Sequence, residues 1–322
     1  MITRGSVCLG LEVAVLSVYD ADSNHFYTGI AKVGKMIWRD LSIEAVDCFE
    51  TRKRRMSGGV DAPDGVFSYV VSIQVHSHHV CAGTIVSPDI VLTAAHCISD
   101  GYKYTVRSGS TTWNSGGSVH EVVSFTRHQQ YKKIEIKNNT LALNDLALIK
   151  VRPLMTSLDV DKVQLFGQNE MLDRKSNVTL IGWGATRKSR PGDFNFGNSW
   201  DVIKSIIVSY DKSHYFSENL KIANFKVLPK EVCASGSLTV LLEKQICAGS
   251  TFASGCKGDS GGPLMVNGRQ VGIMSSCGKE CGHKSSTSIF IDIASYRDWI
   301  DEHIILLDCV LDKEPPPYPI FR

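Results

Sequence analysis

Three short segments of the sequence carry side chains that nucleophilic catalysis can combine. The segment LTAAHC presents His96, the segment NDLAL presents Asp145, and the segment GDSGGP presents Ser260. A lone histidine is usually a surface or satisfied core residue, and a lone aspartate after a loop is usually part of a turn. The serine motif is the most specific, because its glycines place the serine in a tight turn. Together, in this order and with these flanks, the segments indicate a hydroxyl nucleophile with an adjacent base.

In these segments the sequence resembles the trypsin- and chymotrypsin-like serine peptidases, in particular secreted members of the insect type, over about residues 56–307. The resemblance implies a Ser-His-Asp triad in which His96 takes the proton of Ser260, while Asp145 orients the imidazole and stabilises its cation. It also implies an oxyanion hole made by the backbone N–H groups of Gly258 and Ser260, where losing one donor costs about 3–4 kcal/mol in comparable enzymes. The implied reaction is hydrolysis of peptide bonds through an acyl-enzyme, with no cofactor.

The same resemblance implies a zymogen that is activated by proteolysis. The segment MSGG, which begins at Met56, resembles the new N-terminus of the family, with methionine in place of the usual isoleucine or valine. Cleavage after Arg55 would free the amine of Met56, which would then pair with Asp259. Because a buried lone carboxylate is costly, Asp259 is expected to lie elsewhere before cleavage. Residues 1–55 are therefore expected to be a poorly ordered leader and pro-segment.

The expected specificity pocket departs from that of a trypsin. Alignment through the serine motif places Ser254 at the pocket floor, where a trypsin has an aspartate that pairs with lysine or arginine of the substrate. The same alignment places Gly278 and Ser288 on the walls. The expected preference is therefore for an uncharged side chain, either large and apolar or small. The segment SSCG, which ends at Gly278, replaces the family's Ser-Trp-Gly. Cys277 is expected in place of the tryptophan, and a shift of the alignment by one residue stays open.

Ten cysteines without any C-x-x-C pair favour disulfides in an oxidising compartment over a zinc or redox motif. Sequons at Asn138 and Asn177 and a mostly apolar stretch after Arg4 agree with an extracellular location, although Glu12 interrupts that stretch. The resemblance implies three family disulfides and leaves four cysteines unassigned. The implied pairs are Cys81–Cys97, Cys233–Cys247 and Cys256–Cys281, and the unassigned cysteines are Cys8, Cys48, Cys277 and Cys309.

The segments that must position these residues are short, strand-like and separated by glycine, proline, serine and asparagine, which predicts an all-β fold. A helical stripe of apolar residues follows near the C-terminus, from Tyr296 to Ile304. The resemblance implies two six-stranded antiparallel β-barrels of the chymotrypsin-like fold, closed by this C-terminal helix. The expected divisions are the leader and pro-segment (1–55), a peptidase domain (56–307) with a large surface insertion at about 187–218, and a tail (308–322).

The composition excludes several other classes of function. The chain of 322 residues is 43% hydrophobic and 21% charged, with a formal net charge of only +2, so neither nucleic acid nor a membrane is the expected partner. No apolar run approaches the ~20 residues that cross a bilayer. The expected partners are protein or peptide substrates, an activating protease that cleaves after Arg55, and proteinaceous inhibitors of a monomeric enzyme. No metal is expected, because the loop at 107–117 has no carboxylate.

Two other classes of function stay open at this stage. A catalytically weak or inactive homologue that uses the fold for binding would account for the unusual pocket wall, for Met56 and for the long insertion. The intact triad and the glycine turn favour an active enzyme over this alternative. A structural, disulfide-rich extracellular module would leave the three ordered motifs unexplained.

Overall fold

The structure is a computed structural model that divides into two compact units, Met1–Lys53 and Arg54–Arg322. Each unit is described by itself below. Within the part of the chain that the structure describes, no helix is long and apolar enough to span a bilayer. The described residues are 7–10, 13–20, 25–32, 59–136, 139–153, 155, 161–188, 214–233, 243–277 and 287–311.

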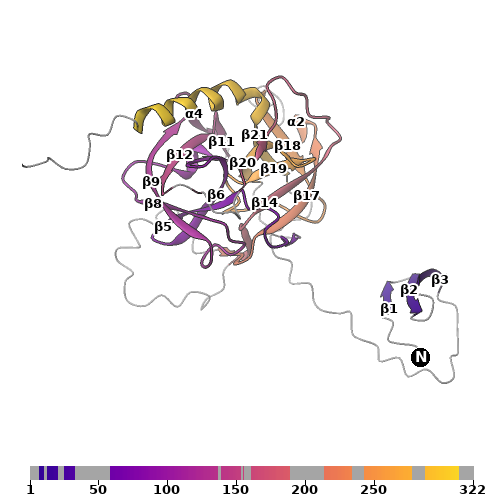
Figure 1. Ribbon diagram of the computed structural model, residues 1–322. Coiled ribbons are helices and arrows are strands. Elements are labelled where there is room, and N and C mark those ends of the chain that lie inside the picture. Colours follow the sequence, from indigo (N-terminus) through magenta and orange to yellow (C-terminus); the bar gives the residue numbers. More distant parts are fainter. Residues whose placement is uncertain are drawn as a thin grey trace, which may run out of the picture. The chain divides into compact units, whose positions relative to one another are not determined.

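The first unit contains a three-stranded antiparallel sheet in the order β1-β2-β3 (Figure 1). Its strands are β1 (Val7–Gly10), β2 (Val13–Asp20) and β3 (His25–Lys32). Strands β2 and β3 pair along their whole length, from Val13 with Lys32 to Asp20 with His25. These strands lie within residues 1–55, which the sequence analysis expected to be a leader and pro-segment. Their valines, aromatic residues and isoleucine favour extended backbone.

The second unit begins with a closed six-stranded antiparallel barrel, drawn in violet and magenta in Figure 1. Aliphatic and β-branched residues such as Ile73, Leu92 and Leu148 fill it and are fully buried. A hairpin of β10 (Lys132–Ile136) and β11 (Asn139–Leu143) lies between its last two strands in sequence. In barrel order the strands are β12 (Ala147–Arg152), β7 (Ile90–Thr93), β6 (His78–Ser87), β5 (Val70–Val75), β8 (Tyr104–Ser108) and β9 (Ser118–Arg127).

A second barrel follows, in rose, orange and yellow in Figure 1, and pairing between β20 and β21 closes it. Leu180, Phe225 and Phe290 lie in its buried core. Two short strands join it from outside: β4 (Val60–Asp61) pairs with β17, and β13 (Gln164–Leu165) pairs in parallel with β20. In barrel order the strands are β20 (Arg269–Cys277), β19 (Pro263–Val266), β14 (Asn177–Gly182), β17 (Lys221–Leu228), β18 (Gln245–Gly249) and β21 (Thr287–Asp292).

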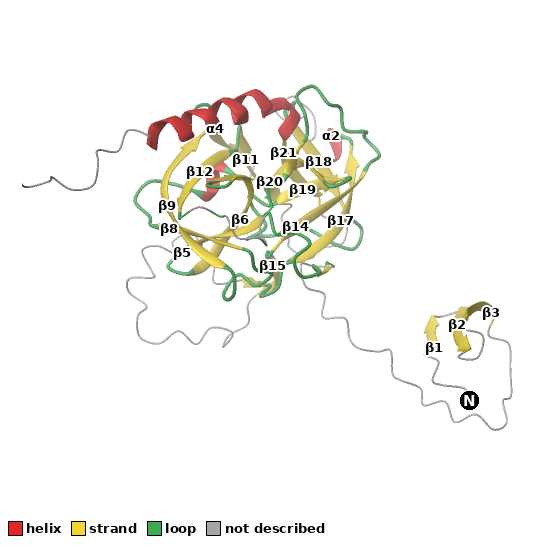
Figure 2. Cartoon of the chain, in the orientation of Figure 1, coloured by secondary structure: helices red, strands yellow, loops and turns green. Residues whose placement is uncertain are grey.

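Helix α4 (Arg297–Leu311) lies along one side of the two barrels (Figure 2). It continues directly from the 3-10 helix η3 (Ile293–Tyr296), and its residues Ile300 and Leu307 join the buried cluster of the first barrel. The prediction of two six-stranded antiparallel barrels with a C-terminal helix is confirmed. The helix extends past the expected boundary at 307, because its apolar residues continue beyond that point.

The remaining described elements are short. Helix α2 (Lys230–Cys233) precedes β18, and β15 (Ala185–Lys188) pairs with β16 (His214–Phe216). This last hairpin contains the two ends of the insertion expected at 187–218. The rest of that insertion lies outside the described residues.

Candidate active site

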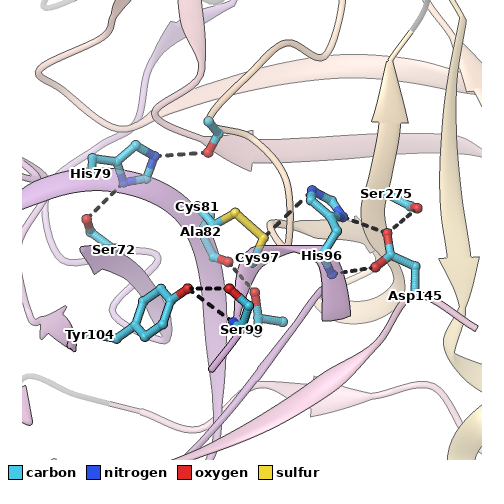
Figure 3. The surroundings of a disulfide bond; sticks show 12 residues. Ser72, His79, Cys81, Ala82, His96, Cys97, Ser99, Tyr104, Asp145 and Ser275 are labelled. Carbon is cyan, nitrogen blue, oxygen red and sulfur yellow. Dashed lines mark hydrogen bonds and ion pairs between the residues drawn. A yellow bond between two sulfur atoms is a disulfide. The ribbon is translucent and has the colours of Figure 1, made fainter. Parts of the chain in front are cut away.

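The fold brings His96 and Asp145 together at one end of the first barrel. His96 lies in the 3-10 helix η1 (Ala95–Cys97) directly after β7, and Asp145 lies just before β12, the neighbour of β7. The backbone N–H of His96 donates to Asp145 Oδ1 at 2.8 Å, and the His96 Nδ1–H donates to Asp145 Oδ2 at 2.7 Å (Figure 3). The histidine is thereby held in the tautomer whose Nε2 carries a lone pair, and Nε2 lies 3.9 Å from Sγ of Cys97.

Asp145 is kept ionised although it is fully buried. Burial alone would raise the pKa of this carboxyl, but the charge of His96 and its two hydrogen bonds act in the opposite direction. The hydroxyl of Ser275 adds a further hydrogen bond to Oδ2 at 2.6 Å. Together these contacts hold the pKa of Asp145 below its ordinary value. Ser275 is thus the residue of the SSCG segment that faces the carboxylate, a role that sequence reasoning did not assign.

Ser260 lies in a turn of the second barrel that packs against the first. The backbone N–H of Ala82 donates to the Ser260 carbonyl at 2.8 Å, and the Thr93 hydroxyl donates to the Ala82 carbonyl at 2.8 Å. Gly261 has a φ of 78°, and a Cβ at this position would collide with the Thr93 hydroxyl and the Ala82 carbonyl. The turn therefore approaches the segment that leads into His96 as closely as a glycine allows.

The same turn contains the two backbone N–H groups that the resemblance assigns to an oxyanion hole. Within the described residues, the N–H groups of Asp259, Gly261 and Gly262 donate to carbonyl groups of the protein, whereas no such bond is recorded for those of Gly258 and Ser260. Gly258 has a φ of 92°, in the region that favours glycine. The structure thus brings the two expected donors together in one turn.

Asp259 points inward from this turn and is fully buried. Its carboxylate accepts the N–H of Gly184 at 2.8 Å and the N–H of Cys256 at 2.9 Å. Burial raises the pKa of Asp259 to about 7, although these two hydrogen bonds act against the shift. In this structure backbone donors satisfy the buried carboxyl, and the expectation that Asp259 lies elsewhere before cleavage stays a prediction.

His79 on β6 supports the serine turn from behind, and sequence reasoning missed it. Its Nε2–H donates to the carbonyl of Gly258 at 2.9 Å, so its Nδ1 accepts the hydroxyl of Ser72 at 2.9 Å (Figure 3). Burial lowers the pKa of His79 to about 4, partly offset by the bond to Gly258. The imidazole is therefore neutral at physiological pH and fixes the carbonyl of an expected oxyanion residue. Three histidines in the segment HSHH offered no signal that would single it out.

The expected pocket residues are brought together only in part. Ser254 and Ser288 are both fully buried, and the Ser288 hydroxyl lies 3.0 Å from the position that a Cβ on the neighbouring Gly255 would take. Cys277, at the end of β20, pairs with Ser288 on β21 and is a free thiol whose pKa is raised mainly by burial. Gly278 lies outside the described residues.

Two of the three implied disulfides are confirmed. Cys81–Cys97 ties β6 to the helical turn that carries His96 (Figure 3). Cys233–Cys247 ties α2 to β18. Cys256 is also disulfide-bonded, but its expected partner Cys281 lies outside the described residues. The activation residues Arg55 and Met56 lie outside them as well.

Comparisons with known proteins agree with this geometry. A family model described as Trypsin matches residues 56–300. A trypsin from Phaedon cochleariae is 30% identical over 76% of this chain and 86% of its own length, and trypsin epsilon from Drosophila erecta is 30% identical over 77% and 86%. Hypodermin-B from Hypoderma lineatum is 29% identical over 77% of this chain and 87% of its own length.

A solved structure supports the fold. Neuropsin, a serine protease expressed in the limbic system of mouse brain, superposes with a TM-score of 0.62 at 24% identity, over 76% of this chain and 98% of its own. Together with the family match, the two-barrel fold and the paired His96 and Asp145 place the protein in a defined class. The chain belongs to the trypsin family of serine-type endopeptidases, hydrolases that act on proteins or peptides.

Proposed function

We propose that this protein is a secreted serine endopeptidase, made as a zymogen, that cleaves peptide bonds with His96, Asp145 and Ser260 as its triad. The observation that carries the proposal is the buried Asp145, which holds His96 at 2.7 Å beside the segment against which the Ser260 turn packs. An imidazole held in this tautomer is a competent general base for a neighbouring hydroxyl.

In the proposed reaction, His96 Nε2 takes the proton of the Ser260 hydroxyl as its oxygen attacks the substrate carbonyl carbon. The resulting oxyanion accepts the N–H groups of Gly258 and Ser260, and Asp145 stabilises the imidazolium. His96 then gives its proton to the leaving amine, so that the C–N bond breaks and an acyl-enzyme remains. Water, deprotonated by His96, attacks the ester carbonyl, and Ser260 recovers its proton as the acid product leaves.

Activation is proposed to follow cleavage after Arg55 by another protease. The freed amine of Met56 would pair with Asp259, whose pKa is raised to about 7 by burial. An ammonium group beside this carboxyl would stabilise its ionised form and could draw the serine turn into its active arrangement. Residues 1–55 would thus be the leader and pro-segment, and residues 56–307 the peptidase domain.

The proposed specificity is for uncharged side chains. Ser254 and Ser288 are buried and carry no charge. They therefore offer no charge partner for a lysine or arginine side chain at the substrate position next to the cleaved bond. A small or apolar side chain would fit such a pocket better.

An extracellular location agrees with the disulfides of the second unit. We further propose a monomer that needs no cofactor or metal and that binds proteinaceous inhibitors.

The test is to cleave the full chain after Arg55 with trypsin, remove the trypsin, and measure labelling by a fluorophosphonate probe. Labelling that needs both cleavage and Ser260, and that is lost in Ser260→Ala, is the expected result. Equal labelling before and after cleavage would contradict the zymogen. A folded, cleaved protein that takes no label would instead point to a non-catalytic homologue that acts by binding.

A further inference from the structure

The start of α4 packs against the loop that follows β9 through an aromatic cluster. The rings of Trp299 and His303 stack with centroids 4.3 Å apart, and the ring of His128 lies 5.2 Å from that of Trp299. His303 is only 8% exposed, whereas Gln129, which bridges the two segments, is exposed. The cluster is outside the triad, and nothing in the proposed reaction uses its histidines.

Three hydrogen bonds close a ring at this contact. The indole N–H of Trp299 donates to Gln129 Oε1 at 2.9 Å, Gln129 Nε2 donates to His303 Nε2 at 2.8 Å, and His303 Nδ1–H donates to the Trp299 carbonyl at 2.9 Å. An indole N–H can only donate, so it fixes the orientation of the Gln129 amide. The amide N–H then requires a lone pair on His303 Nε2. The ring is therefore complete only when His303 is neutral.

The ring adjoins the residue that presents Asp145. Asn144 precedes Asp145 with a φ of 51°, and both ends of its side-chain amide are held. The hydroxyl of Tyr296 donates to its Oδ1 at 2.7 Å, and its Nδ2 donates to the carbonyl of Gln130 at 2.9 Å. Gln130 follows Gln129 in sequence, and Tyr296 immediately precedes α4. Movement of α4 relative to the loop would thus disturb both supports of Asn144.

We propose that Gln129, Trp299 and His303 form a proton-sensitive clasp that positions the Asp145 loop, and that a proton on His303 opens it and lowers activity at mildly acid pH. The inference rests on the proposed function, since the position of Asp145 affects activity only if the triad works. On protonation, the new N–H of His303 would face the amide N–H of Gln129, two donors without an acceptor. If the Gln129 amide turned over to accept from His303, its N–H groups would instead face the indole N–H of Trp299, again two donors without an acceptor.

Positive charge lies near His128, whose ring packs against Trp299 of the same contact. Lys244 Nζ lies 5.4 Å from the ring centre of Tyr296. Burial, the charge of Lys244 and the charge of His303 lower the pKa of His128. A histidine whose folded-state pKa is lowered contributes stability at neutral pH that is lost as the pH falls through that pKa. Neutral His128 therefore adds to the stability of the contact between α4 and the loop after β9.

Acidic groups of the region are mostly engaged with other partners. Asp145 binds His96, and Asp292 accepts the hydroxyl of Ser295 at 2.7 Å, while both act electrostatically on Tyr296. The other charged groups on α4 and at the end of β9 are Asp298, which accepts the side-chain amide of Gln168, Asp301 paired with Arg297, Asp308 paired with Lys150, Arg127 paired with Asp100, and the exposed Glu302. None of these pairs supplies the acceptor that a protonated His303 Nε2 would need.

The decisive variant is Gln129→Glu, because a carboxylate accepts from both the Trp299 N–H and a protonated His303. The ratio of kcat/KM at pH 5.5 to that at pH 7.5 should rise about threefold above the wild-type ratio. Any loss of activity at acid pH that is common to both proteins cancels in this comparison. The Tm of the variant, relative to wild type, should also be about 2–4 °C higher at pH 5.5 than at pH 7.5.

Matched controls separate the clasp from general effects of charge. His303→Gln removes the imidazole of the clasp and should also flatten the pH dependence of kcat/KM and Tm. His78→Gln removes an exposed histidine outside the clasp and should leave that pH dependence unchanged.

Identical pH profiles of Tm and activity in wild type and Gln129→Glu would contradict the proposed clasp. A shifted Tm profile with an unchanged activity profile would overturn its link to Asp145. Absence of activity at every pH would defeat the proposed function, and the Tm profiles would still decide whether the clasp exists.

Discussion

At the scale of single residues, Asp259 and His79 show how burial sets the state of the serine turn. Asp259 is held by two backbone N–H groups and His79 by one carbonyl and one hydroxyl, all without a counter-charge among these contacts. Burial shifts the two pKa values in opposite directions, upward for the acid and downward for the base. Both groups are therefore biased toward their neutral forms.

This bias predicts a pH dependence of stability in the uncleaved protein. The pKa of Asp259 is raised to about 7, above its ordinary value of about 4. The folded protein therefore holds a proton that the unfolded chain releases, and the contribution of Asp259 to stability is lost as the pH rises toward and through 7. Urea unfolding of wild type and Asp259→Asn from pH 5 to pH 8 should show a smaller decline in the variant. Parallel curves would contradict the raised pKa.

At the scale of elements, the docking of α4 on the first barrel combines apolar contacts with a buried charge. Lys150 on β12 is nearly buried and pairs with Asp89 at 2.5 Å and with Asp308 of α4 at 2.6 Å. Burial alone would lower the pKa of Lys150, but the two carboxylates outweigh it and raise the pKa. The lysine therefore stays charged and links two segments of the barrel to the helix.

Removing this charge should destabilise the fold. Lys150→Met leaves Asp89 without its partner in a largely buried position, and we expect the free energy of unfolding to fall by about 2 kcal/mol. Asp308→Asn should cost less than about 1 kcal/mol, because that carboxylate is half-exposed and solvent screens the pair. Urea unfolding measures both values. An equal decrease in the free energy of unfolding in the two variants would contradict the idea that the burial of Asp89 determines the size of the effect.

At the scale of the whole molecule, the candidate active site exists only where the two barrels meet. The first barrel supplies His96 and Asp145, and the second supplies the turn with Ser260. Gly261 is a point of close approach between them, against Thr93 and Ala82. The disulfide Cys81–Cys97 stiffens the first-barrel side of this junction.

The close contact of the two barrels at Gly261 predicts that adding a single methyl group there strongly lowers activity. Gly261→Ala should lower kcat/KM more than about 100-fold, because the Cβ has no space and the turn must move away from His96. Gly268→Ala is the matched control: Gly268 has a φ of 75°, against 78° at Gly261, but no atom within 4 Å of an added Cβ. Gly268→Ala should lower the free energy of unfolding by about 1–2 kcal/mol, the cost of a side chain at a positive φ, and should leave activity unchanged. Similar activities of the two variants would contradict the close approach.

Much of the molecule could be predicted from the sequence because the informative features are local. The segments around His96, Asp145 and Ser260 lie at strand ends and turns whose backbone is encoded within a few residues. The alternation of strand-like segments and turns indicated an all-β fold, and the family resemblance supplied the two barrels, the C-terminal helix and the pairs Cys81–Cys97 and Cys233–Cys247, all confirmed.

Contacts between distant segments could not be predicted, because no local pattern encodes them. His79 and Gly258 are 179 residues apart in sequence, and Gln129 and His303 are 174 apart. Ser275 reaches Asp145 across 130 residues, and the burial of Asp259 depends on glycines of a different strand. Their protonation states follow from desolvation and from hydrogen-bond partners, both of which arise only when the barrels pack. Residue types along the chain therefore predicted which groups could react, and packing settled how they are held and which of them carry charge.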